Sequence, residues 1–325
     1  TPFLNSSLSE VAVASSCLAP SIWSKNVNRV NQNPVPTIPM WTQLEQTFLR
    51  SLGPHALTDL GQIFTTHPST QRFLVTIGGD QLTGKSTLTQ SLSVSPDVLS
   101  IVTGGPIATR STGQTMRDLA TEKGVRIGEL STFLRQNNDE DQGIVDINLD
   151  YKTCQVLAGQ YDETAGMLIM EGRQPAVMAS YVTEQVPGAS QLPFRVYLKC
   201  SVREQALRYI GREVHALARE EVERFLPQGG DDMYPTMEHV LAKMKGQTFA
   251  GHAQVMEGFR ANMDRDADDK ARFDMLYGEQ CHYRNEEFYD LVIDTSYIEA
   301  EDKVNQVTQG WLEWLMHNNF GVKRG

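Results

Sequence analysis

The 325-residue sequence has few cysteines and no long apolar segment. Its four cysteines, Cys17, Cys154, Cys200 and Cys281, are far apart, with no C-x-x-C pair and no histidine cluster beside them. This spacing argues against a disulfide framework and against a zinc site, and it favours reducing, intracellular surroundings. Because no run of about 18 apolar residues exists, we expect a soluble protein without membrane insertion.

The chain begins with Thr1 rather than with a methionine. Removal of an initiator residue and cleavage of a longer presequence both explain this start. The sequence does not decide between cytoplasm and mitochondrial matrix. Because there is no apolar core of a secretory signal, a retained signal peptide is excluded.

Positive charge is also scarce. Lysine and arginine number 29 against 40 aspartates and glutamates, which gives a net charge of −11. A protein that binds nucleic acid through phosphate contacts needs a basic surface, so we expect no nucleic-acid partner. An enzyme acting on nucleotides remains compatible with this charge, because only its cleft must be basic.

The most informative segment is Gly79–Ser86, which reads G-x-x-x-x-G-K-S, the phosphate-binding P-loop pattern. The apolar run 72–77 before it predicts a buried strand, and residues 87–92 after it predict a helix. This arrangement directs backbone N–H groups and a helix N-terminus at a polyphosphate. The residues expected to bind ATP are Gly79, Asp80, Thr83, Gly84, Lys85, Ser86 and Thr87.

Within this loop, Lys85 is expected to reach the β- and γ-phosphates, and the Ser86 hydroxyl is expected to bind Mg²⁺. Leu82 occupies a position where many such loops have a small residue. Its side chain must therefore point away from the phosphates.

Predicted strands and helices alternate after this loop. Further strands are predicted at 99–103, 167–170, 194–198 and 291–293. Helices are predicted at 113–124, 127–136, 144–159, 201–224 and 299–318, the fourth capped by Ser201 and Glu204. This order predicts an α/β fold, a doubly wound parallel sheet of about five strands.

Residues 1–70 differ from the rest and are interpreted as an N-terminal extension, followed by one domain at 71–325. Residues 1–40 are rich in Ser, Asn and Pro and predict loops, whereas 41–64 predicts two helices broken at Gly53-Pro54. Such an arm must pack on its own domain or on a partner, so a protein partner bound through the arm is an open alternative.

Six further motifs follow the loop in a fixed order. They are Ser111–Arg117 (S-x-G-x-x-x-R), Asp146–Asp150 (D-x-x-x-D), Glu171–Arg173 (E-G-R), Arg208–Glu213 (R-x-x-x-R-E), Arg265–Phe273 (R-x-x-x-D-x-x-R and an aromatic) and Tyr289–Ser296 (Y-D-L-x-I-x-T-S). Together they resemble the nucleoside monophosphate kinases, in particular the archaeal and cytidylate-kinase-like branch of the cytidylate kinase family. The resemblance implies a P-loop kinase fold with helical monophosphate-binding and lid segments. It also marks 218–261 as an insertion.

The resemblance implies two further sets of site residues. The acceptor would be bound by Ser111, Gly113, Arg117, Arg173, Gln174, Arg265, Asp269 and Arg272. Phosphoryl transfer would depend on Lys85, Arg173, Arg208, Arg212 and Arg272. Several arginines suit this reaction because it brings two polyanions together, and a guanidinium binds phosphate oxygens bidentately.

The implied activity is ATP- and Mg²⁺-dependent phosphoryl transfer to a nucleoside monophosphate, with CMP or dCMP the expected acceptor. Close bacterial cytidylate kinases have Asp where this chain has Gln174, so the base stays open. A P-loop kinase for another small acceptor is one alternative, which Gln174 and the insertion support. Another is a kinase fold retained as an accessory subunit of a larger, mitochondrial complex. The retained Lys85, Ser86 and Arg173 speak against it.

Overall fold

The computed structural model describes residues 27–28, 40–66, 73–102, 105–125, 130, 141–159, 165–186, 193–213, 223–224, 226–227, 234–245 and 252–318. Most of the loop-rich arm, nearly all of the helix expected at 127–136 and parts of the 218–261 insertion lie outside these residues. No helix of the described part is both long enough and apolar enough to cross a membrane.

Five parallel strands form the centre of the molecule, in the order β6-β5-β2-β4-β3. Their bounds are β2 Phe73–Gly79, β3 Ile107–Ser111, β4 Met167–Glu171, β5 Pro193–Lys199 and β6 Leu291–Asp294. A two-residue strand of the arm, β1 (Val27–Asn28), pairs antiparallel with β6 at the edge. The sheet confirms the predicted α/β fold. After β2 the chain adds β3 and β4 on one side of this strand and then β5 and β6 on the other side. Ligands of such folds bind at the carboxyl end of the sheet where the strand order changes direction.

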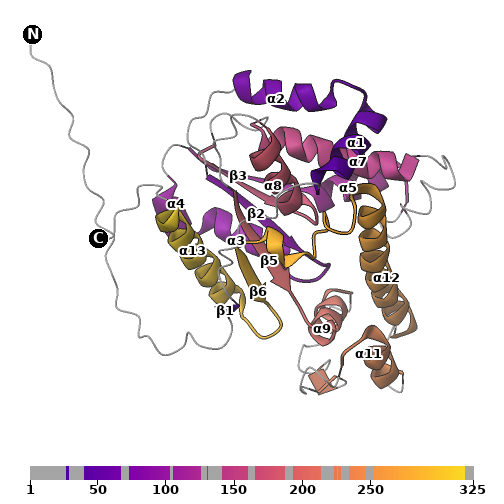
Figure 1. Ribbon diagram of the computed structural model, residues 1–325. Helices are drawn as coiled ribbons and strands as arrows, with labels where there is room; N and C mark the ends of the chain where they lie inside the picture. The colour runs from indigo at the N-terminus through magenta and orange to yellow at the C-terminus, as the bar shows by residue number, and fades with distance from the viewer. Residues whose placement is uncertain are drawn as a thin grey trace, which may run out of the picture.

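The strands alternate between two apolar layers, as the period of two requires. On β2, Val75 and Ile77 face one layer and Leu74 faces the other. Figure 1 shows helices on both sides of the sheet. The first layer contains α3 (Lys85–Val94), α4 (Pro96–Ile101) and α13 (Ala300–His317), and the second contains α1 (Trp41–Leu52), α2 (Ala56–Thr66), α7 (Asp141–Leu157) and α8 (Pro175–Gln185).

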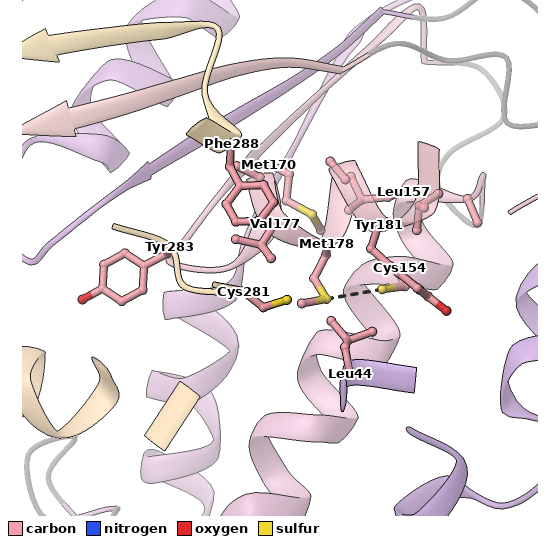
Figure 2. Close-up of a cluster of buried hydrophobic side chains, with 14 of the residues drawn as sticks. Leu44, Cys154, Leu157, Met170, Val177, Met178, Tyr181, Cys281, Tyr283 and Phe288 are labelled. Carbon is pink, nitrogen blue, oxygen red and sulfur yellow. Dashed lines mark hydrogen bonds between the residues drawn. The ribbon is translucent and has the colours of Figure 1, made fainter. Parts of the chain in front are cut away.

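The second layer is a dense core of aromatic and sulfur-containing side chains. Figure 2 shows part of it, with Cys154 Sγ and Met178 Sδ 3.5 Å apart. Trp41, Leu44 and Phe48 of α1 are fully buried in this core. The three cysteines that the structure describes, Cys154, Cys200 and Cys281, form no disulfide. The N-terminal helices therefore share their core with the sheet.

A third apolar cluster lies beside the sheet. It is formed by α9 (Val202–Glu213), α11 (Met237–Met244) and the first half of α12 (His252–Tyr277). Phe259 of α12 is buried in this cluster, whereas Phe273 and Tyr277 at the other end of the same helix belong to the sheet core. The helix α12 thus joins the two (Figure 1).

The strand predicted at 99–103 is wrong. Residues up to Ile101 belong to α4, which begins with Pro96 at its first turn, and Leu99 is exposed. A short apolar run does not distinguish a strand from a helix, and proline at the first position favours the helix. The strand of this region is instead β3, whose Thr109 and Arg110 are exposed at the sheet edge and gave no apolar signal.

The other predicted elements agree with the structure where it describes them. The helices α1 and α2 are separated at Gly53, whose φ of 99° suits glycine. The predicted cap of α9 is half formed. Ser201 Oγ accepts from the Glu204 backbone N–H at 3.3 Å, but the Glu204 carboxylate bonds Arg208 instead of returning to the cap.

Candidate functional site

The loop Gly79–Ser86 joins β2 to α3 at the carboxyl edge of the sheet. Gly79 and Gly84 have φ values of 145° and 93°. A Cβ atom on Gly79 would lie 2.5 Å from the Leu198 carbonyl oxygen, so only glycine fits there. Leu82 also has a positive φ, 62°, and its side chain packs against the third apolar cluster.

Lys85 and Ser86, the residues expected to contact phosphate and Mg²⁺, are held by hydrogen bonds at the start of α3. Lys85 Nζ donates to the Gly79 carbonyl oxygen at 2.8 Å and to that of Asp80. Burial, and next the charge of Arg173, lower the pKa of Lys85 to about 8. Ser86 Oγ donates to the Glu171 carboxylate at 2.9 Å. The first N–H groups of α3 lack helical acceptors and are free for an anion.

Arg208 braces the loop from outside the sheet. It donates to the Leu82 carbonyl oxygen at 2.9 Å, to Glu204 at 2.9 Å and to both oxygens of Thr295. The Thr295 hydroxyl lies 3.0 Å from the Thr83 carbonyl oxygen, to which it can donate. Contact of Arg208 with a bound phosphate stays a prediction. In the structure its guanidinium shapes the loop.

The Asp80 carboxylate has a similar bracing role. Its Oδ1 accepts from the Tyr283 hydroxyl at 2.7 Å and from Arg284 Nε at 2.8 Å. Both donors lie between α12 and the 3-10 helix η2 (Glu286–Phe288). The second residue of the loop is thus fixed by a segment some 200 positions later, which no sequence pattern indicates.

A cleft of about 420 Å³ opens in front of the loop. Its described lining contains all eight residues expected to bind the acceptor, which are Ser111, Gly113, Arg117, Arg173, Gln174, Arg265, Asp269 and Arg272. Gly84, Lys85, Ser86 and Thr87 line it from the loop, and Arg212 lines it from α9. Gly79, Asp80, Thr83 and Arg208 shape the loop behind this wall. Elements far apart in sequence therefore converge on one cavity.

The cleft is basic although the chain is acidic. Its lining includes six cationic side chains, Lys85, Arg117, Arg173, Arg212, Arg265 and Arg272, and four carboxyl groups, Asp146, Asp150, Glu171 and Asp269. The whole chain has a net charge of −11. A local excess of positive charge inside a cavity attracts and concentrates anions.

Two of these arginines are fixed by aspartates of α7 and α12. Arg173, just after β4, pairs with Asp266 and Asp269 of α12. Arg272 of α12 pairs with Asp269 and with Asp146 of α7. Asp266 also accepts from the Gln81 backbone N–H at 3.2 Å, which ties α12 to the loop Gly79–Ser86. These pairs hold the guanidinium groups in place before any ligand binds.

Arg117 and Arg265 have no carboxylate partner among the described residues. The Arg117 side chain, on α5 (Thr112–Glu122), makes one hydrogen bond within the described structure, in which its Nε donates to Gln114 Oε1 at 3.0 Å. Burial, and next the charge of Arg173, lower the pKa of Arg265 to about 10. Because burial and the neighbouring Arg173 destabilise the charged form of Arg265, a bound anion would stabilise that charge strongly.

Gln174 lines the same cleft and has one acceptor atom without a partner among the described residues. Only 2% of its surface is exposed, and its Nε2 donates to the Cys281 carbonyl oxygen at 3.3 Å. Its Oε1 is buried and has no hydrogen-bond partner in the described structure. Nearby, Asp150 accepts from the Tyr277 hydroxyl at 2.8 Å, and burial raises the pKa of this carboxyl group to about 8.

Glu171 and Asp266 are site residues that the sequence analysis did not assign. For Glu171 a signal existed, because an acidic residue ends the apolar run 167–170. Such a carboxylate beside the strand of a phosphate loop is a common magnesium ligand. For Asp266 no signal existed, since its partners Arg173 and Gln81 are distant in sequence.

Magnesium would fit between Ser86 and Glu171. A hydroxyl and a carboxylate are hard oxygen ligands, and Mg²⁺ usually completes its shell with water and substrate phosphates. No cluster of three or more His, Cys, Asp or Glu residues suited to a metal occurs in the described part of the chain. A dedicated protein cage is not needed for this ion.

Comparison of the chain with protein-family models and with curated protein sequences finds no match. The resemblance to the nucleoside monophosphate kinases therefore rests on the motifs and on the site they form.

Proposed function

We propose that this protein transfers the γ-phosphoryl group of ATP to a nucleoside monophosphate, with CMP or dCMP the preferred acceptor. The observation that carries the proposal is the single basic cleft in which the loop Gly79–Ser86 faces Arg117, Arg173 and Arg265. A second, separate set of arginines has no purpose in a simple ATPase, but it is required when the acceptor is itself a phosphate.

The half of the cleft nearest the loop suits the donor nucleotide. Lys85 and the N-terminus of α3 would bind the β- and γ-phosphates, and Ser86 and Glu171 would hold Mg²⁺ after their mutual hydrogen bond opens. The bound ion would neutralise charge developing on the phosphate oxygens. Because burial lowers the pKa of Lys85 to about 8 in the free protein, a bound phosphate would raise this pKa and keep the ammonium charged at higher pH.

The opposite half suits the acceptor. Arg117 and Arg265 are cations without a counterion among the described residues, and they would bind the acceptor phosphate. An oxygen of that phosphate attacks the γ-phosphorus, the bond to the β–γ bridging oxygen breaks, and ADP leaves. No side-chain nucleophile is needed, since positioning and charge stabilisation supply most of the rate.

Gln174 supports an amino-bearing base. Because its Nε2 already donates to the Cys281 carbonyl, the atom offered to a ligand is Oε1, which only accepts. Cytosine presents an amino group at the 4-position, whereas uracil presents a carbonyl oxygen there. A buried acceptor facing a carbonyl is unfavourable, so CMP is favoured over UMP.

The test is ADP release by the purified protein, measured against a panel of ribo- and deoxyribonucleoside monophosphates. We expect turnover with CMP or dCMP and a loss of about 100-fold or more in Lys85→Ala. Lys123→Ala, which changes an exposed lysine outside the cleft, is the matched control. Equal turnover of the Lys85 variant and the control would disprove the donor assignment.

A second candidate, a kinase for another small acceptor, is favoured by one observation. A hollow of about 770 Å³ adjoins the cleft at Ser86 and Glu171, and hydroxyl and amide side chains form most of its wall together with Arg110 and Lys152. Such a lining suits a polyhydroxylated acceptor. Sugar phosphates in the same assay distinguish this candidate, because they would then be phosphorylated faster than any nucleotide.

A further inference from the structure

The helix α1 has no part in the site described above. It precedes all of the motifs that carry the kinase resemblance, and none of its residues lines the cleft. Nevertheless α1 packs against α12, near the end of α12 that joins the sheet core (Figure 1). Since α12 carries several residues of the cleft, the contact with α1 affects where those residues lie.

The contact supplies donors to the last carbonyl groups of α12. Thr47 Oγ1 donates to the Leu276 carbonyl oxygen at 2.7 Å, and Gln43 Nε2 donates to that of Met275 at 3.0 Å. The final carbonyls of a helix have no donor within the helix. Thr47 is buried, so loss of its hydroxyl would leave the Leu276 carbonyl without this partner.

The start of α1 also holds the segment after α12. Cys281 Sγ donates to the Met40 carbonyl oxygen at 3.2 Å, and the Cys281 carbonyl in turn accepts from Gln174. Figure 2 shows Cys281 in the same buried cluster as Leu44 of α1. One face of α1 therefore supports both α12 and the group that orients the Gln174 amide.

We propose that α1 and its N-cap residue Met40 form a positioning element for the acceptor half of the cleft, acting through Met40, Gln43 and Thr47. The inference rests on the proposed kinase function. Leu276 follows Arg272 by four residues and Arg265 by eleven, so a helical rise of about 1.5 Å per residue places these arginines about 6 and 16 Å from the support. A small tilt of α12 at its end moves them by an ångström or more, which is enough to impair transfer.

The experiment uses the full chain with Thr47→Val, which keeps the side-chain shape and removes the donor. Thr47→Ser restores the donor, and Thr42→Val makes the same change at an exposed position of α1. Gln43→Leu removes the second bond at an exposed site and is tolerated even if Thr47→Val folds poorly. Hydrogen exchange of the α12 amides and steady-state kinetics for both substrates are measured well below the unfolding temperature.

We expect faster exchange across α12 and an acceptor KM raised about tenfold or more in Thr47→Val, and a smaller change in Gln43→Leu. The KM for ATP should stay unchanged, and Thr47→Ser and Thr42→Val should resemble the parent. Unchanged exchange in both Thr47→Val and Gln43→Leu would overturn the support by α1. Faster exchange with an unchanged acceptor KM would overturn its role in positioning. Absence of transfer by the parent protein would instead refute the kinase function, while the exchange data still decide whether α1 holds α12.

Discussion

If the loop Gly79–Ser86 binds ATP as proposed, its affinity for ATP is expected to fall as the pH rises through about 8. The reason is Lys85, whose pKa is lowered to about 8 by burial and by the charge of Arg173. Phosphate binds the charged ammonium, so the free protein must be protonated at this position to bind well. The charged fraction is about 90% at pH 7 and about 10% at pH 9, which corresponds to roughly a tenfold weaker affinity.

The measurement is a titration with Mg²⁺ and a non-hydrolysable ATP analogue between pH 7 and pH 9.5. The ligand phosphates titrate near pH 6 and are already about 90% ionised or more over this range. Lys85→Met is the control, because it should bind weakly with no pH dependence from this position. A parent affinity that stays constant from pH 7 to pH 9 would refute the assignment of Lys85 to the phosphates.

Three further outcomes are expected. Asp150→Asn should flatten the dependence of the unfolding free energy on pH. In the folded protein the Asp150 carboxyl has a pKa of about 8, above its ordinary value of 3.8. The protonated carboxyl therefore contributes its full stabilisation below about pH 4, and this contribution is lost as the pH rises towards 8. Chemical denaturation at pH 5 and pH 8 should show this as up to a few kcal/mol in the parent and no such loss in the variant. Arg265→Met should raise the acceptor KM at least tenfold and leave the ATP affinity unchanged. A fall in ATP affinity with an unchanged acceptor KM would show that Arg265 belongs to the donor subsite and not to the acceptor subsite. Deletion of residues 1–39 should leave nucleotide binding intact. Size-exclusion chromatography of native and truncated protein from source extract tests whether the arm binds a protein partner. An unchanged elution volume would exclude this alternative.

Local pattern was sufficient for the parts of this protein that are contiguous in the chain. The loop Gly79–Ser86 with its strand and helix, the apolar strand Met167–Glu171 and the final helix Ala300–His317 all follow from the spacing of their own residues. The edge strand Ile107–Ser111 did not, because an edge strand buries little and its exposed polar residues give no apolar period. The ordered motifs also indicated the eight residues expected to bind the acceptor, and the fold brings all eight to one cleft.

Tertiary structure alone decided how these residues are held. The pairs Arg173–Asp266 and Arg272–Asp146 join residues 93 and 126 positions apart, and Asp80 meets Arg284 across 204 positions. The same is true of Gln174. The distant Cys281 carbonyl accepts from its Nε2, and this bond orients the amide so that Oε1 is left without a partner in the described structure. Sequence periodicity records which side of an element is apolar, but charge pairing, amide orientation and pKa depend on the groups that folding brings within a few ångströms. That is why the sequence alone predicted the loop Gly79–Ser86 with its strand and helix, whereas the arrangement of the charged and amide groups across the cleft from it was decided by the tertiary structure.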